Sequence, residues 1–338
     1  MFFVIPQVSE AQSSSESDIN VQAKVSHSSR TSVNSYNIID NNTGALNHSY
    51  PMMVPPGRNN LQPELSLSYN SSITNNGSIF GFGWDVSIPY IQRLNKVGSD
   101  KLYDASSQKY FYSSLDGELV NTSGSSYIPK IENGRFNKYT FFENKWQVTD
   151  KNGVQYKFGY DASSQQNNSA NPNNVYKWML QEVRDTNDNY ISYFYFKDSG
   201  QIYPLSIKYT NNGIVEGIFE ISFQRAARAD NFVSYATGFS VNSNYLINQI
   251  DVKVNNDWVK KYVLNYIKSQ DANKSLLKSI TMSGKDGSGN IVALPQTDFS
   301  YQSSGVNWNK TDAWNFPIPV GNNLEPYFPD LNGDGLPD

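Results

Sequence analysis

The nine residues "DLNGDGLPD" at 330–338 have the types and spacing that could bind a metal ion. Calcium prefers several hard oxygen ligands, and alternate positions of a tightly wound loop converge on one centre. Gly333 and Gly335 allow the backbone to wind that sharply. The predicted ligands are the side-chain oxygens of Asp330, Asn332, Asp334 and Asp338 and the main-chain carbonyl of Leu336. The sequence therefore predicts calcium as a cofactor, held by a loop at this end of the chain.

The residues around this loop indicate which kind of calcium loop it is. A helix–loop–helix site needs a glutamate at about loop position 12 and a helix on each side. The loop here stops at Asp338, and the preceding "NFPIPVGNNLEPYFP" is too rich in proline and glycine to be helical. A loop between strands fits better, and a solvated Asp-rich tail is the alternative. "DTNDN" at 185–189 has a similar spacing, but the strand patterns that flank it predict a hairpin turn.

Other catalytic chemistry has little support in the sequence, and no catalytic residue is predicted. The chain has no cysteine and two histidines, His27 and His48, and neither has a nucleophile or carboxylate close to it in sequence. We therefore expect two solvated histidines rather than a Ser-His-Asp or zinc site. Acidic residues such as Asp116 and Asp150 lie in turn sequences. A glycosidase pair of carboxylates is accordingly a weak alternative.

Composition excludes two classes of partner, and the first residues of the chain indicate export. A net charge of −4 without a basic cluster gives no basis for nucleic-acid binding, and no apolar run is long enough for a transmembrane segment. Residues 1–11 end in a small-x-small pattern and are interpreted as the remnant of a secretory signal whose start lies upstream. Residues 12–35 are Ser-rich with few large apolar side chains and predict a disordered arm. The predicted location is therefore extracellular.

The elements that would position any site are predicted to be strands. Alternating patterns such as "LQPELSLSY" (61–69) and "GVQYKFG" (153–159) recur, separated by turn sequences such as "LDGE" and "KNGV". In "NYISYFYF" (189–196) both faces are apolar, so we expect both to be covered. The best short helix candidate is "QRAARAD" at 224–230, and 160–176 is predicted to be a polar loop. The predicted fold class is all-β, a large antiparallel meander of hairpins.

Two motifs are predicted to matter for the fold rather than for chemistry. Pro55, Pro56 and Gly57 should stiffen a turn before a strand, with Arg58 paired to an acid or to carbonyl groups. "FGFGW" at 80–84 lacks the lysine and the following helix of a phosphate loop. Its glycines instead predict a close approach of the backbone or a bulge. Its tryptophan is predicted to fill the core between two sheets. The residues assigned to this motif are Gly81, Gly83 and Trp84.

The segment 49–93 resembles the opening of the Salmonella virulence-plasmid B protein (SpvB) family, which it shares with the TcaC-type B component of insecticidal toxin complexes. The features that carry the likeness are "PPGR", "LSYNS", "GFGW" and Arg93, and the resemblance continues from about residue 45 to 338. Later segments are also similar to the tyrosine- and Asp-rich YD, or Rhs, shell repeats. "FPDLNGDGLPD" resembles the opening of an integrin-like FG-GAP repeat of the VCBS type, whose loops bind calcium in a propeller blade.

The resemblance implies a shell-like β domain at 36–310. It also implies the start of a calcium-binding repeat at 311–338, as the first loop of a truncated β-propeller. It implies a non-enzymatic toxin or virulence function, in which the β domain is a scaffold or encapsulating shell. The implied partners are an Rhs-type toxin C component and a pore-forming A component. Two alternatives stay open: a surface adhesin or glycan-binding module, and the N-terminal part of an ADP-ribosyltransferase whose catalytic domain lies outside this chain. We expect weak calcium binding, or none, from this chain alone.

Overall fold

The computed structural model describes residues 21–22, 36–73, 77–104, 110–269 and 273–301. These residues form three antiparallel sheets and three short 3-10 segments, η1 (Arg58–Asn60), η2 (Ser99–Lys101) and η3 (Ala162–Ser164), and no α-helix. The all-β prediction is confirmed. Across the same residues no helix is long and apolar enough to cross a membrane. The predicted propeller loop lies outside the described residues.

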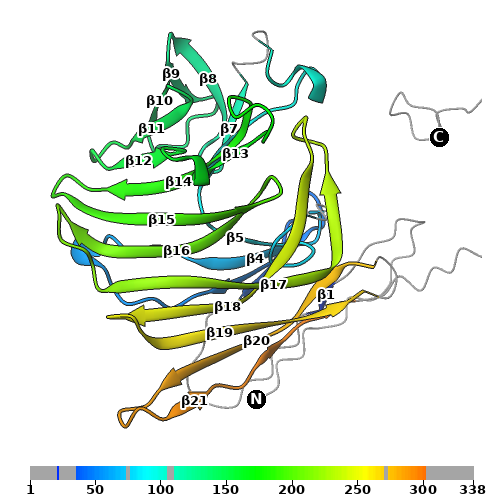
Figure 1. The fold of residues 1–338 in the computed structure, drawn as a ribbon, viewed down its shortest axis with the longest axis vertical. Coiled ribbons are helices and arrows are strands. Elements are labelled where there is room, and N and C mark those ends of the chain that lie inside the picture. The colour runs from blue at the N-terminus through cyan, green and yellow to red at the C-terminus, as the bar shows by residue number, and fades with distance from the viewer. Residues whose placement is uncertain (1–20, 23–35, 74–76, 105–109, 270–272, 302–338) are drawn as a thin grey trace, which may run out of the picture. The chain divides into compact units, whose positions relative to one another are not determined.

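The largest sheet is a meander of long hairpins, stacked in chain order in Figure 1. Each strand pairs with the next one in sequence, and the last two both pair with β20. Its strands are β14 (Val175–Arg184), β15 (Asn189–Asp198), β16 (Gln201–Asn212), β17 (Phe219–Ser234), β18 (Val241–Val254), β19 (Asp257–Lys268), β20 (Ser275–Lys285), β21 (Ile291–Ala293) and β22 (Thr297–Asp298). We refer to β15–β22 together with β14 as the large sheet.

A second group of strands closes into an eight-stranded ring, drawn in cyan and green in Figure 1. Seven of its strands precede β14, and β14 itself closes it by pairing with both β12 and β6. The seven are β6 (Tyr90–Arg93), β7 (Phe111–Ser113), β8 (Gly117–Ser123), β9 (Ser126–Pro129), β10 (Lys138–Phe142), β11 (Lys145–Thr149) and β12 (Gln155–Phe158). We call these seven strands and β14 the ring.

Strand β14 therefore belongs to both the ring and the large sheet. In its first half, Lys177 lies opposite Gln92 of β6 on one edge and Gln166 of β13 (Gln165–Asn167) on the other. In its second half, Val183 lies opposite Tyr156 of β12 and also opposite β15. The aromatic side chains that fill the ring are almost fully buried because they point into its closed interior; they are Phe111, Trp146, Phe158 and Trp178.

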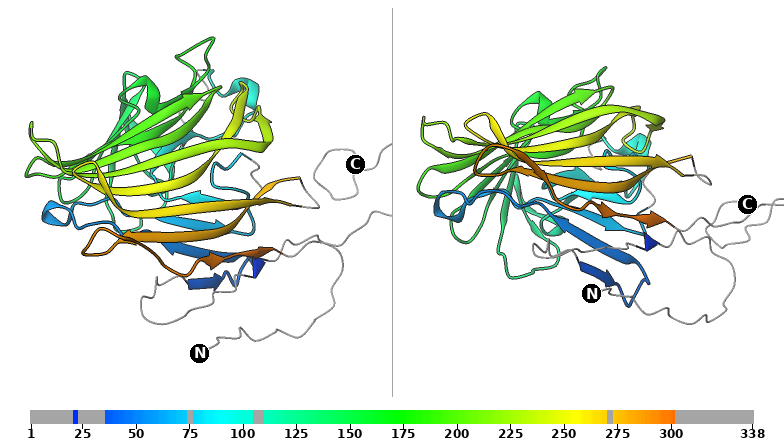
Figure 2. Two further views of the ribbon diagram at one scale, coloured as in Figure 1. Left: turned by 60° about the horizontal axis from the view of Figure 1, so that its bottom comes forward. Right: turned by 90° about the horizontal axis from the view of Figure 1, so that it is seen from below.

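The ring and the large sheet are parts of one closed sheet, and a separate small sheet packs against the large-sheet strands, as the view from below in Figure 2 shows. Its strands, in spatial order, are β2 (Tyr36–Ile39), β3 (Leu46–Pro51), β4 (Ser66–Asn70) and β5 (Trp84–Val86). The alternation predicted in "LQPELSLSY" holds, because Leu67 and Tyr69 are buried while Ser68 is exposed. A separate pair joins β1 (Val21–Gln22) to β23 (Ser300–Tyr301).

Two local predictions were wrong or incomplete. "QRAARAD" at 224–230 is not helical but lies inside β17, where Ala226 and Ala227 pair with Leu246 and Tyr245 of β18. Sheet pairing with a long neighbouring strand overrides the weak helix preference of the alanines. The predicted polar loop 160–176 contains both η3 and β13.

Candidate functional site

The tryptophan of the GFGW motif lies at the centre of the junction between the small sheet and the last strands of the large sheet. Trp84 is 1% exposed, and its indole N–H donates to the hydroxyl of Tyr301 (2.8 Å). Its ring centroid lies 4.7 Å from that of Phe299 and 5.4 Å from that of Tyr69. Edge-to-face packing of this kind adds to the burial of the rings. We call the cluster of Trp84, Tyr69, Phe299, Tyr301 and His48 the seam.

The two glycines of the motif leave room for this packing. Gly83 has φ +78°, and a Cβ there would lie 2.5 Å from Cε2 of Tyr69. Gly81 has φ +92°, and its Cβ would lie 3.2 Å from the carbonyl oxygen of Ser275 on β20. A side chain at Gly83 would therefore collide with the seam, and one at Gly81 would press on the large sheet, in addition to the cost of a positive φ.

The Pro-Pro-Gly-Arg turn lies over the large sheet. The hydroxyl of Tyr209 donates to the carbonyl of Pro55 (3.0 Å), while Pro56 is exposed. A Cβ on Gly57 would lie 1.9 Å from the carbonyl oxygen of Leu61, so this position excludes any other residue. Arg58 is exposed at the start of η1 and makes no ion pair with any described residue.

A buried ion pair that the sequence did not reveal fastens the loop before Trp84. Arg228 and Asp230 of β17 form a two-point pair, with both nitrogen–oxygen distances 3.0 Å and side chains 2% and 9% exposed. Arg228 also donates to the carbonyl of Ser78 (3.1 Å), and Asp230 accepts from the main-chain N–H of Ser275 (2.6 Å). Burial raises the pKa of Asp230, but these hydrogen bonds outweigh burial and hold that pKa below its ordinary value. The signal was present in "RAD", where charges two residues apart share one face of a strand.

His48 is a further correction, because it is buried rather than solvated. It is 3% exposed in β3, and its ring lies 5.8 Å from Trp84 and 5.5 Å from Phe299 between centroids. Its Nδ1–H donates to Oδ1 of Asn37 (2.6 Å). Burial lowers the pKa of His48 to about 4, so the ring is neutral at pH 7. The polar sequence around it was misleading because alternate residues of β3 face the core. His27, the other histidine, lies outside the described residues.

The acidic turns use their carboxylates to shape hairpins. Oδ1 of Asp185 accepts from the backbone N–H of Asn187 and of Asn189 (both 2.9 Å). Asp150 and Asp286 accept in the same way from the residues two and four positions later. The hairpin turn predicted at 185–189 is confirmed. No group of three or more metal-binding side chains occurs within the described ranges.

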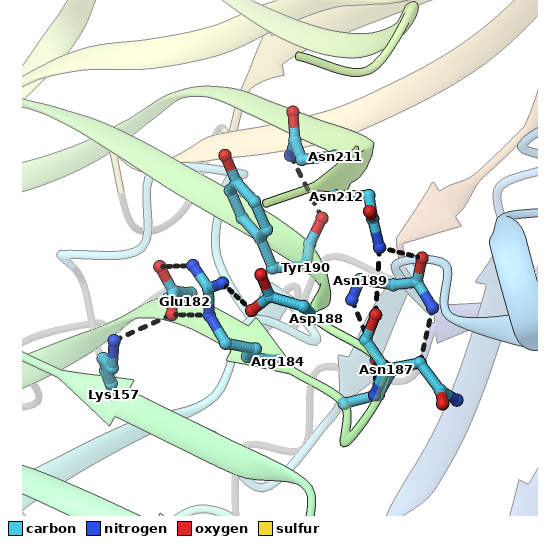
Figure 3. A network of polar contacts seen from close by, with 10 residues as sticks. Lys157, Glu182, Arg184, Asn187, Asp188, Asn189, Tyr190, Asn211 and Asn212 are labelled. Atoms are coloured by element: carbon cyan, nitrogen blue, oxygen red, sulfur yellow. Dashed lines mark hydrogen bonds and ion pairs between the residues drawn. The ribbon is translucent and has the colours of Figure 1, made fainter. Parts of the chain in front are cut away.

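Figure 3 shows the polar network around this turn, where the ring meets the large sheet. Glu182 pairs with Lys157 and Arg184 (both 2.9 Å), and Arg184 also pairs with Asp188. The amide of Asn212 donates to Asn189 (3.0 Å), which links the turn to β16. The network therefore joins β12, β14 and β16, and its charged groups pair with one another.

Several predicted residues lie outside the described part of the chain. They are the five calcium ligands, Asp330, Asn332, Asp334, Leu336 and Asp338, together with the signal remnant 1–11 and most of 12–35. The structure brings together the GFGW motif, His48 and residues 299–301. It places the Pro-Pro-Gly-Arg turn elsewhere on the large sheet, against Tyr209 and, through Asn59, against Asp185 (3.3 Å).

Comparisons with known proteins give one family. The model of the Salmonella virulence plasmid 65kDa B protein, SpvB, matches residues 40–139 and 121–275. The N-terminal domain of effector protein SpvB from Salmonella typhimurium strain LT2 is similar, with TM-score 0.59 and 16% identity over 70% of this chain and 98% of that chain. The predicted family resemblance is confirmed. No curated protein sequence matches.

Larger solved structures contain the same fold. TcdB2-TccC3 matches with TM-score 0.66 and 18% identity over 87% of this chain and 17% of that chain. The Photorhabdus luminescens Tc holotoxin pore matches with TM-score 0.65 and 18% identity over 81% of this chain and 16% of that chain. The chain thus spans about a sixth of the length of these toxin-complex chains. At these identities the likeness is one of fold.

Proposed function

Because this chain belongs to the family of the Salmonella virulence plasmid 65kDa B protein, we propose that residues 36–310 are a non-enzymatic wall segment of a toxin-complex-like virulence protein. The wall would act as a scaffold or encapsulating shell for a toxin. The observation that carries this proposal is the match to the SpvB N-terminal domain over 98% of that chain and to a sixth of TcdB2-TccC3. The same fold therefore occurs as one part of much larger toxin-complex chains.

The internal chemistry of the domain supports a structural role. The carboxylates at the hairpin turns accept hydrogen bonds from their own backbone. The buried pair of Arg228 and Asp230 fastens one segment to another, and the large sheet is built from long consecutive hairpins. Groups that are matched within the protein give a rigid surface, which suits a wall better than a catalytic centre, where charges are kept available for a substrate.

The partners of this wall follow from the same resemblance. We propose an Rhs-type C component as the enclosed chain and a pore-forming A component as the delivery partner, outside the bacterial cell. Calcium at Asp330, Asn332, Asp334, Leu336 and Asp338 remains part of the proposal, as the first loop of a propeller repeat. Calorimetry that found tight calcium binding by this chain alone would contradict the expectation that the loop needs the rest of its blade.

Protease protection tests the shell role directly. The full-length protein that contains this chain is co-expressed with an Rhs-type C component, and the purified complex is treated with a non-specific protease. We expect the C-terminal part of the C component to survive in the complex and to be digested when that component is treated alone. A complex that forms without protection, or no complex at all, contradicts the proposal.

A matched pair of variants shows whether this domain contributes to the protection. Trp84→Ala removes the centre of the seam and should shorten the time for which the cargo survives. Trp258→Ala removes a partly exposed tryptophan of β19 and should leave that time unchanged. Equal survival with both variants would mean that the wall does not depend on this domain.

The glycan-binding alternative has one feature in its favour, a surface pocket of about 260 Å³. Tyr156, Asn152, Asn133, Arg135 and Lys151 are among its lining residues. A tyrosine ring beside amide and charged groups is a surface on which a sugar could stack and form hydrogen bonds. Binding to a glycan array that is lost in Tyr156→Ala would establish this second function, and the absence of binding would exclude it for the glycans tested.

A further inference from the structure

Two neighbouring side chains of the small sheet carry buried polar atoms without a hydrogen-bond partner among the described residues. They are Nε2 of His48 and the hydroxyl of Tyr69. The two residues lie directly opposite each other on β3 and β4, and both face the seam. A buried polar atom that makes no hydrogen bond is costly, so its presence in a packed core needs a reason.

The surroundings of His48 decide what its protonation would do. Asn37 of β2 accepts from Nδ1, so the neutral ring carries its free lone pair on Nε2. Trp84 of β5 and Phe299 present aromatic edges or faces to the ring. The other titratable groups of the seam are Tyr69 and Tyr301, and burial raises the pKa of both, so neither supplies a negative charge at acidic pH.

A proton added at Nε2 would create a new N–H without an acceptor among the described residues, and a positive charge surrounded by aromatic rings. Transfer of an unpaired charge into such a site is strongly unfavourable. Burial alone lowers the pKa of His48 to about 4, against 6.5 for an exposed histidine. Any opening that lets water reach the ring is therefore favoured as the pH falls below 6.5.

The segment that would open is held by few backbone pairs. Strand β22 pairs with β20 through two residues, and β23 pairs with β1 through two residues. Between them, Phe299 is attached to β20 by one backbone hydrogen bond, to the carbonyl of Lys278 (2.8 Å). By contrast, nine residue pairs join β19 to β20. Short strands with few ladder bonds open at lower free energy than long ones.

We propose that His48 is an acid-sensitive latch between the small sheet and residues 297–301. When the ring is neutral, it packs against Trp84 and Phe299 and the seam stays closed. When the ring takes up a proton, the segment 297–301 separates from β3 and β5 and the imidazolium reaches water. The rest of the large sheet stays paired, so acid loosens one end of the domain rather than unfolding it.

Histidine NMR on the unaltered chain tests the first half of the latch. The chain has two histidines, so a sample labelled at the imidazole carbon gives two signals. We expect one signal to titrate near pH 6.5 and the other to keep its neutral shift down to about pH 5, as a folded pKa of about 4 requires. The variant His27→Gln assigns the signals. If the His48 signal titrates near pH 6.5 in the folded protein, the latch does not exist.

Hydrogen exchange tests the second half. Between pH 7.5 and 5, and after correction for the intrinsic rate, exchange of the amides of Phe299 and Tyr301 should accelerate about 30-fold. The amides of β19 should change less than about 2-fold, because the change is local. The acceleration should disappear in His48→Gln, which cannot take up the proton, and persist in His27→Gln. An equal acceleration in His48→Gln, or one shared by β19, would overturn the proposal.

Discussion

The ring and the seam both bury large aromatic side chains, but they are closed by different forces. The ring is closed by backbone pairing, strand to strand, with β14 completing the circle against β12 and β6. The seam is closed by side chains, chiefly the hydrogen bond from Trp84 to Tyr301 and the packing of Phe299. Damage to the ring should therefore spread through β14 into the large sheet, whereas damage to the seam should stay near its own segments.

The largest expected effect is that of Trp178→Ala in β14. Trp178 is fully buried, donates to the carbonyl of Asn144 (2.7 Å) and packs against Phe111 and Trp146. Removal of the indole side chain should lower the free energy of unfolding by about 3–5 kcal/mol. Because β14 is shared, the ring and the large sheet should lose protection together in hydrogen exchange. Guanidinium denaturation, followed by circular dichroism, measures the cost.

Trp258→Ala is the matched control, since Trp258 of β19 is partly exposed, and it should cost less than about 1 kcal/mol. A Trp178→Ala protein whose large sheet kept its normal protection would contradict the view that β14 couples the two regions.

The second effect in size is that of Asp230→Asn, which removes the carboxylate charge facing Arg228. The guanidinium is 2% exposed, so loss of its counter-charge should cost about 3 kcal/mol. Exchange should rise mainly in the loop that carries Ser78 and Phe82, because these are tied to Arg228 and Ser275.

The control for this variant breaks an exposed pair. Nζ of Lys285 lies 2.6 Å from Oδ1 of Asp257, and the side chain of Asp257 is 69% exposed. Asp257→Asn should therefore lower the free energy of unfolding by less than about 1 kcal/mol. Equal costs for the two variants would show that the pair at Asp230 does not fasten the loop before Trp84.

Gly83→Ala and Gly117→Ala separate packing from backbone strain. Both glycines have a positive φ, +78° and +80°, but only at Gly83 does an added Cβ meet another atom, Cε2 of Tyr69 at 2.5 Å. We expect a cost of about 1 kcal/mol at Gly117 from φ alone, and about 2–3 kcal/mol at Gly83. Thermal denaturation of the two variants gives the comparison. Equal costs would mean that the Tyr69 ring moves aside without loss of stability, so that the seam is loosely packed.

The smallest effect is that of Asp185→Ala at the turn between β14 and β15. Its carboxylate accepts from two backbone N–H groups and from Asn189, and losing these bonds should cost about 1–2 kcal/mol at pH 7. Burial raises the pKa of Asp185, but the hydrogen bonds from Asn189 outweigh burial and hold that pKa below 3.8. The wild-type protein should therefore have its full extra free energy of unfolding above pH 3.8. This difference from the variant should decrease as the pH falls through the lowered pKa of Asp185. Urea denaturation at pH 7 and pH 2.5 checks this, and an advantage that persisted at pH 2.5 would contradict it.

The sequence predicts local structure well and long-range closure poorly. Alternation in 61–69 correctly placed Leu67 and Tyr69 in the core. The turn sequences "LDGE" and "KNGV" correctly predicted the hairpins β7–β8 and β11–β12. Nothing in the alternation reveals that β6 pairs with β14, because that register depends on how seven strands curve. Alternation also misled at Phe194, which is 43% exposed although both faces of its strand are apolar.

The site was predicted in part for the same reason. The motif residues Gly81, Gly83 and Trp84 were found from a local cluster of glycine and tryptophan. His48 was missed because its role depends on Phe299, which lies far away in the sequence and whose position only the folded structure defines.

The bond between Trp84 and Tyr301 has a consequence for how the protein is made. Its two partners are 217 residues apart, so Tyr301 leaves the ribosome long after the small sheet has been synthesised. At a synthesis rate of about 5–20 residues per second, the apolar face of that sheet waits roughly 10–40 seconds for the strands that cover it. During this interval Tyr69 and Trp84 of the nascent chain are open to contact with other proteins. A chaperone that binds nascent chains would have its longest period of action here, on residues 46–86.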